Sequence, residues 1–81
     1  MEQIKTKFSL QISDLRKQQN LTQEQASERL ETFLRCFQKW ESGNSLPDFL
    51  HTLALVYFLD FDFNSFAKEA FSNGIIQTAE R

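Results

Sequence analysis

The sequence predicts a compact all-α domain of about five short helices, and three observations lead to that prediction. Glycine and proline are scarce in the 81 residues, at two and one. Little of the chain alternates polar with apolar residues as a half-buried strand does, whereas apolar residues recur at helical spacing. A chain of this length is sufficient for one small core. We expect a domain over residues 1–74 and a C-terminal tail over 75–81, either frayed or docked on a partner.

The first two helices follow from an apolar stripe and a capping motif. Four residues at spacings of four, four and three form the inner side of a helix over about residues 6–18. They are Ile4, Phe8, Ile12 and Leu15. Further along, Thr22 and Gln25 fit a capping box, in which both side chains satisfy free backbone donors at a helix start. A second short helix is therefore expected directly after Thr22.

The third predicted helix runs from about Phe33 to Ser42, with Thr32 as its cap and Gly43 as the stop. At about 100° per residue its apolar residues share one face. They are Phe33, Cys36, Phe37 and Trp40. The opposite face carries Arg35, Gln38, Lys39 and Ser42. These groups can read base edges in a major groove, and an ordinary solvated helix face is the alternative.

Two further helices complete the expected domain. Pro47 suits the first turn of a fourth helix, which ends at about Leu59. Residues 60–63 are expected to connect it to a fifth helix over 64–72, which Asn73 and Gly74 end.

The fourth helix is apolar on nearly all sides, so protein must surround it. Phe49, Leu53 and Val56 form the stripe that we expect in the core. The remaining apolar surface is covered either by the first and fifth helices or by a second copy of the chain. The homodimer surface predicted in the second case comprises Leu50, Ala54, Tyr57, Phe58 and Phe61.

The motif residues resemble the phage-repressor (Cro/cI, XRE-type) helix-turn-helix family, at the family's separations and without a gap. The matching segments are Leu15-Arg16-Lys17, Leu21-Thr22-Gln23-Glu24, Leu30, Trp40-Glu41-Ser42-Gly43 and Asn44-Ser45-Leu46-Pro47. The resemblance covers roughly residues 8–66. It implies a lambda-repressor-like fold and a transcriptional regulator that binds double-stranded DNA, often as a dimer with recognition helices about 34 Å apart.

The resemblance also implies roles for individual residues. Those placed against base edges are Arg35, Gln38, Lys39 and Leu34. Those placed against phosphates are Gln23, Lys17, Arg29, Asn44 and Ser45. In the first set the cations would prefer guanine, and the leucine would offer only apolar contact, for example to a thymine methyl. Arg16 and Glu41 would form a salt bridge between the first helix and the end of the third.

The chain departs from the family in the turn between the second and third helices. Glu31 stands where the family usually has glycine, and a positive φ there would be strained. Our interpretation is that Thr32 takes over capping while Phe33 turns inward to fill space beside Ala26. If Phe33 and Leu34 instead point outward, they form a protein-binding patch. The alternative function is therefore a protein-interaction or antitoxin-like module with weak or no DNA binding.

The charge distribution is uneven. The chain is formally −2, whereas DNA-binding domains are often basic. Residues 1–45 carry seven cations against six acids, or +1, and residues 46–81 carry two against five, or −3. Phosphate attraction depends on the local face, so the acidic half is tolerable. We expect weak non-specific DNA affinity that is sensitive to salt.

Several function classes find no support in the sequence. Cys36 is the only cysteine and His51 the only histidine, so neither a disulfide nor a cysteine-based or histidine-based metal site is expected. No phosphate-cradling glycine loop is present, and we expect neither a cofactor nor an enzyme. The sequence has no run of about 18 apolar residues and no apolar signal segment. A cytoplasmic protein without a membrane partner is expected.

Overall fold

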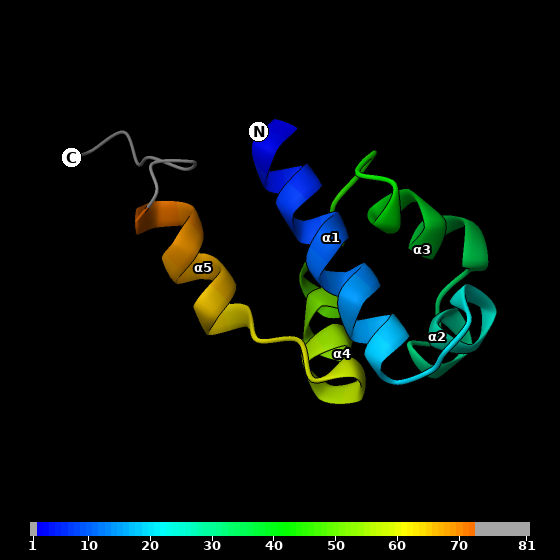
Figure 1. The fold of residues 1–81 in the computed structure, drawn as a ribbon. Coiled ribbons are helices and arrows are strands. Elements are labelled where there is room, and N and C mark those ends of the chain that lie inside the picture. The colour runs from blue at the N-terminus through cyan, green and yellow to red at the C-terminus, as the bar shows by residue number, and fades with distance from the viewer. Residues whose placement is uncertain (1, 73–81) are drawn as a thin grey trace.

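Five α-helices account for most of residues 2–72, the part of the chain that the computed structural model describes, with side chains from Ile4 onward (Figure 1). They are α1 (Glu2–Gln18), α2 (Gln23–Arg29), α3 (Leu34–Glu41), α4 (Phe49–Leu59) and α5 (Phe63–Ser72). The prediction of a compact all-helical fold is confirmed for these residues. The predicted stop at Asn73–Gly74 and the predicted tail over 75–81 lie outside them.

Helix α1 supplies the centre of the core. Its predicted inner stripe is confirmed, because Ile4, Phe8 and Ile12 are buried and Leu15 packs against them. In Figure 1, α1 lies between α5 and the pair formed by α2 and α3. The helix begins at Glu2, four residues before the predicted start at Thr6. The stripe already contained Ile4, so the early start extends the same buried face.

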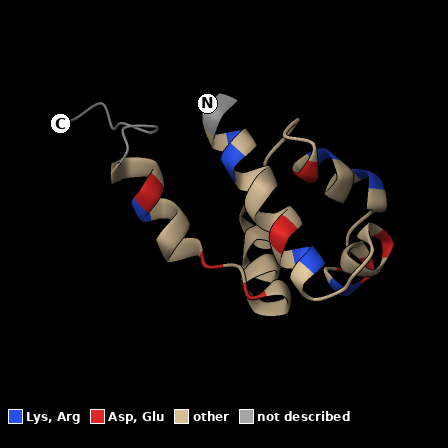
Figure 2. Cartoon of the chain, in the orientation of Figure 1, with Lys and Arg blue, Asp and Glu red and all other residues tan. Residues whose placement is uncertain are grey.

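Helix α4 differs most from its prediction. It begins at Phe49 and not at Pro47, because the side chain of Asp48 caps it by accepting a hydrogen bond from the backbone N–H of His51 at 2.9 Å. The predicted core stripe is wrong: Phe49, Leu53 and Val56 are exposed. The helix carries no Lys, Arg, Asp or Glu (Figure 2). With apolar residues all around it, its sequence does not determine which side turns inward.

The buried side of α4 is formed by Leu55 and Leu59, which are fully enclosed. Its C-terminal end is attached to the turn directly after α1, since the Gln19 side-chain amide donates to the Leu59 carbonyl at 2.8 Å. Asp60 then adopts a left-handed backbone conformation with φ 65°, which turns the chain toward α5. The core therefore reaches α4 along one side only.

Three phenylalanines join α5 to α1. The ring centroids of Phe8, Phe61 and Phe66 lie 5.5 to 5.9 Å apart, within the range for favourable aromatic pairs. Phe61 is therefore in the core with 3% of its surface exposed, and its assignment to a homodimer surface is wrong. An ion pair between Lys7 and Glu69 at 2.8 Å adds a second link between α1 and α5.

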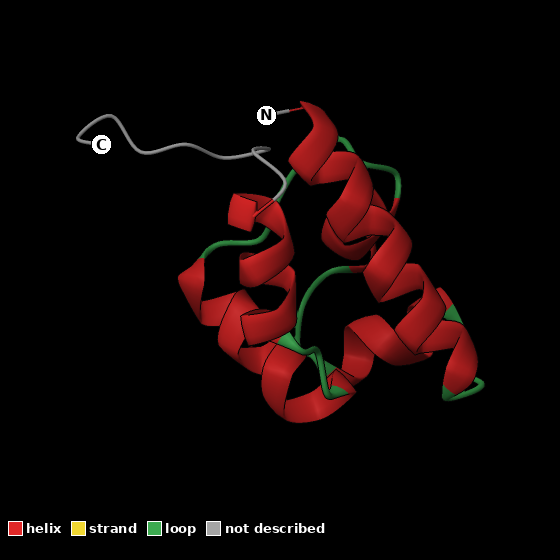
Figure 3. Cartoon of the chain, turned by 60° about the vertical axis from the view of Figure 1, so that its left-hand side comes forward, coloured by secondary structure: helices red, strands yellow, loops and turns green. Residues whose placement is uncertain are grey.

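Within residues 2–72 only helices and loops occur, as Figure 3 shows from a second direction. No helix in this range is both long enough and apolar enough to cross a membrane.

Candidate nucleic-acid interface

Helix α3 presents one face to the core and the other to solvent. Phe37 and Trp40 are buried, with ring centroids 6.0 Å apart, and Trp40 also contacts the His51 ring of α4 at 5.4 Å. Cys36 is half-buried against the same core. The four side chains predicted on the opposite face are all exposed. They are Arg35, Gln38, Lys39 and Ser42.

A chain of hydrogen bonds joins this face to α1 and α2. The Arg16 guanidinium donates to both carboxylate oxygens of Glu41, at 2.6 and 3.2 Å, so the predicted salt bridge is present. The Gln23 amide donates to Glu41 Oε1 at 2.9 Å. The Gln38 side-chain amide in turn donates to the side-chain oxygen Oε1 of Gln23 at 3.2 Å. The network thereby holds a side chain of α3 and one of α2 side by side at the surface.

Two of these contacts were not predicted from the sequence. Gln23 was expected to anchor a phosphate, and the structure also places it between Glu41 and Gln38. The residues are 18 and 15 positions apart, a separation that gives no periodic signal. An amide nitrogen has two N–H donors, so one remains for an anion after the bond to Glu41. The Gln23 side chain can therefore hold Gln38 through its oxygen while its second N–H remains available to a phosphate.

Helix α2 and the connection to α3 have well-defined caps. The predicted capping box is confirmed: Gln25 N–H donates to Thr22 Oγ1 at 3.0 Å, and Thr22 N–H donates to Gln25 Oε1 at 2.9 Å. At the other end Glu31 N–H donates to the Glu28 carbonyl and Thr32 N–H to that of Ser27, the pattern of a Schellman motif. Glu31 has φ 56°, so it keeps the left-handed conformation that favours glycine.

The predicted roles of Thr32 and Phe33 are wrong. Phe33 is the N-cap of α3, and its side chain supplies no capping hydrogen bond. It is 79% exposed, so it does not fill space beside Ala26. The N-cap backbone is extended and not helical, so the helical periodicity that we applied to Phe33 does not hold there. Leu34, the next residue, is half-buried.

The remaining residues predicted to contact phosphates lie on separate elements. Lys17 is in the last turn of α1 and Arg29 in the last turn of α2, both exposed. Asn44 is exposed and Ser45 half-buried in the segment after α3, and their backbone N–H groups donate to the Lys39 carbonyl. Within residues 4–72, no hydrogen bond or ion pair joins the side chains of these four residues to the Arg16–Glu41 network.

The described part of the chain does not bring metal-ligating side chains together into a site. No group of three or more His, Cys, Asp or Glu side chains within it could hold a metal ion. Comparison with known proteins gives no match, whether to a family model, to a curated protein or to a solved structure.

Proposed function

We propose that this protein is a sequence-specific DNA-binding transcriptional regulator of the Cro/cI (XRE-type) helix-turn-helix kind. In this proposal α2 and α3 are the two helices of the motif, and α3 is the recognition helix in the major groove. The observation that carries the proposal is the hydrogen bond from Gln38 on the exposed face of α3 to Gln23 at the start of α2. It couples a base-reading position to a phosphate-contacting one.

The exposed face of α3 has suitable chemistry for base readout. Arg35 and Lys39 are exposed cations four residues apart, so they lie on the same side of the helix. Arginine and lysine donate to O6 and N7 of guanine, and a glutamine amide pairs with adenine. Gln38, held by Gln23, would read a base beside those two. Leu34 would contribute at most an apolar contact at the edge.

The backbone contacts would come from the surrounding elements. The start of α2 offers backbone N–H groups beside the Gln23 amide, and Lys17 and Arg29 add exposed cations. Such contacts position a protein without reading sequence, and they make affinity depend on salt. The net charge of +1 over residues 1–45, from seven cations against six acids, supports only modest non-specific binding.

A second function, a protein-interaction module on the same scaffold, is favoured by one observation. Phe33 is an exposed aromatic side chain beside the base-reading face. Exposed aromatic residues are enriched at protein interfaces. An antitoxin-like protein would combine such a contact with DNA binding.

A selection experiment tests the proposed DNA binding. The purified chain is incubated with a random double-stranded library at low and at moderate salt, and bound DNA is sequenced. We expect enrichment of a motif containing guanine, lost in the variant Arg35→Ala/Lys39→Ala. Lys68→Ala is the matched control, because it removes an exposed cation from α5, away from the proposed site. If folded protein enriches no motif at low salt, the regulator proposal is wrong and the interaction module takes its place.

A further inference from the structure

Helix α4 leaves a large apolar surface uncovered. Tyr57 is 81% exposed, Phe49 78% and Leu50 70%. Leu53 lies between them and is also exposed, so the surface extends along the whole helix, about 16 Å for 11 residues. Contiguous apolar patches on this scale mark interaction sites.

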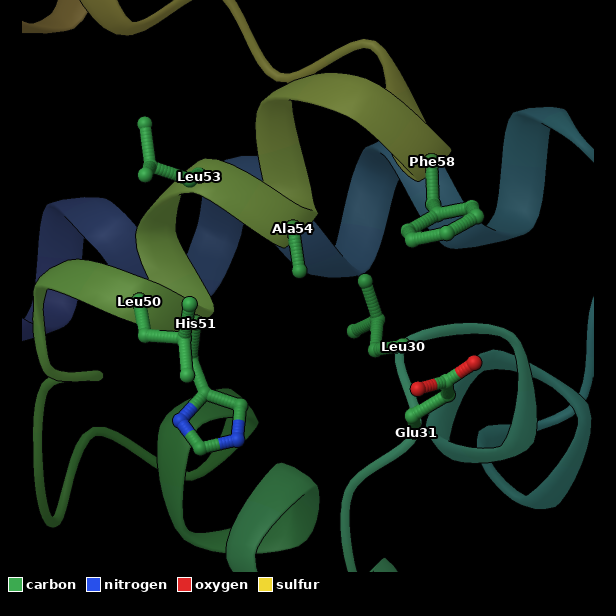
Figure 4. A pocket seen from close by; sticks show the side chains of 7 residues that line it. All are labelled: Leu30, Glu31, Leu50, His51, Leu53, Ala54 and Phe58. Carbon is green, nitrogen blue, oxygen red and sulfur yellow. The ribbon is translucent and has the colours of Figure 1, made fainter.

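A hollow of about 360 Å³ borders this surface (Figure 4). One wall is the α4 side chains Leu50, Ala54 and Phe58, and the other is the α2–α3 connection with Leu30 and Glu31. Most of the lining is apolar; the His51 ring and the exposed Glu31 carboxylate are its polar groups. The hollow therefore accepts apolar side chains of a partner next to a negative charge.

The acidic residues nearest α4 in the sequence lie just beyond its two ends. Between Lys39 and Lys68 the sequence contains no lysine and no arginine. Asp48 caps the start of α4, and Asp60 and Asp62 follow its end, all three exposed. Hydrogen bonds from Ser65 lower the pKa of Asp62, and those from His51 lower the pKa of Asp48, so both favour the charged carboxylate. The apolar surface is thus bounded by carboxylates at both ends.

A second copy of the chain is a poor match for this surface. If two α4 helices pair antiparallel, Asp48 of each copy lies near Asp60 of the other. If they pair parallel, each aspartate lies near its own equivalent. Like charges brought together at an interface are unfavourable. A partner with cations at those places gains attraction instead.

From this complementarity we infer that the α4 face binds an amphipathic helix of another protein, whose apolar stripe is edged by lysine or arginine. The helix lies along α4, with large apolar side chains in the hollow beside Leu30 and cations near Asp48, Asp60 and Glu31. This inference does not rest on the proposed DNA binding, since α4 contributes no residue to that site.

A peptide-binding experiment tests the inference with the full chain. The probe is a labelled synthetic helix with leucines at i, i+3, i+4 and i+7 and lysines beside them, and binding is read by fluorescence anisotropy. We expect Kd to be about tenfold lower than for the same peptide with glutamates in place of the lysines. Tyr57→Ser and Leu50→Ser weaken binding about tenfold, since each removes an exposed contact without opening the core.

Controls distinguish this site from general attraction. Leu10→Ser alters an exposed leucine of α1 and leaves Kd unchanged. Asp60→Asn weakens binding of the lysine peptide and not of the glutamate peptide. The variant should fold, because asparagine tolerates the left-handed backbone at this position. Equal binding of the two peptides, or of a scrambled lysine peptide, overturns the inference. So does a dimer of the chain alone at micromolar concentration that Tyr57→Ser dissociates, because a second copy would then occupy the face.

Discussion

Arg16 and Glu41 form a two-point ion pair between the ends of α1 and α3. Nε and Nη2 of the guanidinium lie 2.6 and 3.2 Å from the two carboxylate oxygens, and the side chains are only 14% and 6% exposed. Nη1 also donates at 2.8 Å to the carbonyl of Leu21, which precedes the N-cap of α2. One arginine therefore fixes the relative positions of α1, α2 and α3.

Removing this arginine should destabilise the fold. In Arg16→Ala the Glu41 carboxylate keeps its hydrogen bond from Gln23 but loses its charge partner in a mostly buried position. The typical loss for breaking such a pair is about 3–5 kcal/mol. Urea denaturation followed by circular dichroism measures it. An unchanged midpoint would contradict a structural role for the pair.

A double variant shows how much of that loss comes from an isolated charge. Replacing both partners, in Arg16→Met/Glu41→Leu, removes the pair without leaving one charge behind. We expect this double variant to be more stable than Arg16→Ala. If its loss of stability equals the sum of the losses in Arg16→Met and in Glu41→Leu alone, the residues do not act as a pair.

Glu31→Gly should stabilise the protein. Glu31 has φ 56°, a conformation that costs a residue with a side chain about 1–2 kcal/mol and glycine nothing. Glycine also gains freedom in the unfolded chain, which offsets part of the gain, so we expect a net increase of about 0.5–1 kcal/mol. Thermal and urea unfolding give the value. Asn20→Gly is the matched control at φ 59°, where the smaller strain of asparagine predicts a smaller change.

The sequence predicted the fold where its patterns were strong. Mostly polar residues separate Ile4, Phe8 and Ile12, so a helix can bury these three only by turning one particular side to the core. The structure turns that side inward. The capping box at Thr22 depends on contacts within four residues, and it too is present. In α4 nearly every position is apolar, so the helix was predictable but its buried side was not.

The candidate site was predictable in part for the same reason. The outward face with Arg35 and Lys39 follows from the burial of Phe37 and Trp40 on the other side of the helix. The contact of Gln23 with Glu41 depends on how α2 docks against α3, which local patterns do not encode. Phe33 was misplaced because the helix starts one residue later than expected, at Leu34.

Phe33→Ser should stabilise α3. Phe33 occupies the N-cap without a capping hydrogen bond, and its exposed ring buries little surface. Serine accepts from the free N–H groups of the first turn, which contributes about 1 kcal/mol. Phe33→Ala separates the two effects, because it removes the ring without adding a cap. Equal stability of the serine and alanine variants in thermal unfolding would show that no cap forms.

Asp48 should make stability depend on acid pH. Hydrogen bonds from the backbone N–H and then the ring of His51 hold the pKa of Asp48 below its ordinary value of 3.8. The unfolded chain therefore takes up a proton first as pH falls. The contribution of this cap to stability is complete above pH 3.8, the ordinary pKa of the group. It is lost as pH falls through the lower pKa of the folded state.

The measurement compares melting temperatures from about pH 2 to pH 6 for the parent chain and Asp48→Asn. Asparagine caps a helix without a titrating group, so the variant should lose less stability on acidification. Asp62 is unchanged in both proteins, and its own acid dependence cancels in the comparison. Parallel curves would exclude a contribution from Asp48.

Residues proposed to read bases and residues proposed to contact phosphates should differ in how their removal affects DNA binding. Arg35→Ala should weaken binding to a selected site by about 1–3 kcal/mol and relax the preference at one base pair, since Arg35 lies on the exposed face of α3. Lys17→Ala should weaken binding to all DNA sequences alike and reduce the slope of log K against log salt concentration by about one. Titrations of the selected site and of single-base variants at several salt concentrations separate the two effects. If Arg35→Ala weakens every sequence equally, Arg35 contacts the backbone, and the base-reading face is not where we place it.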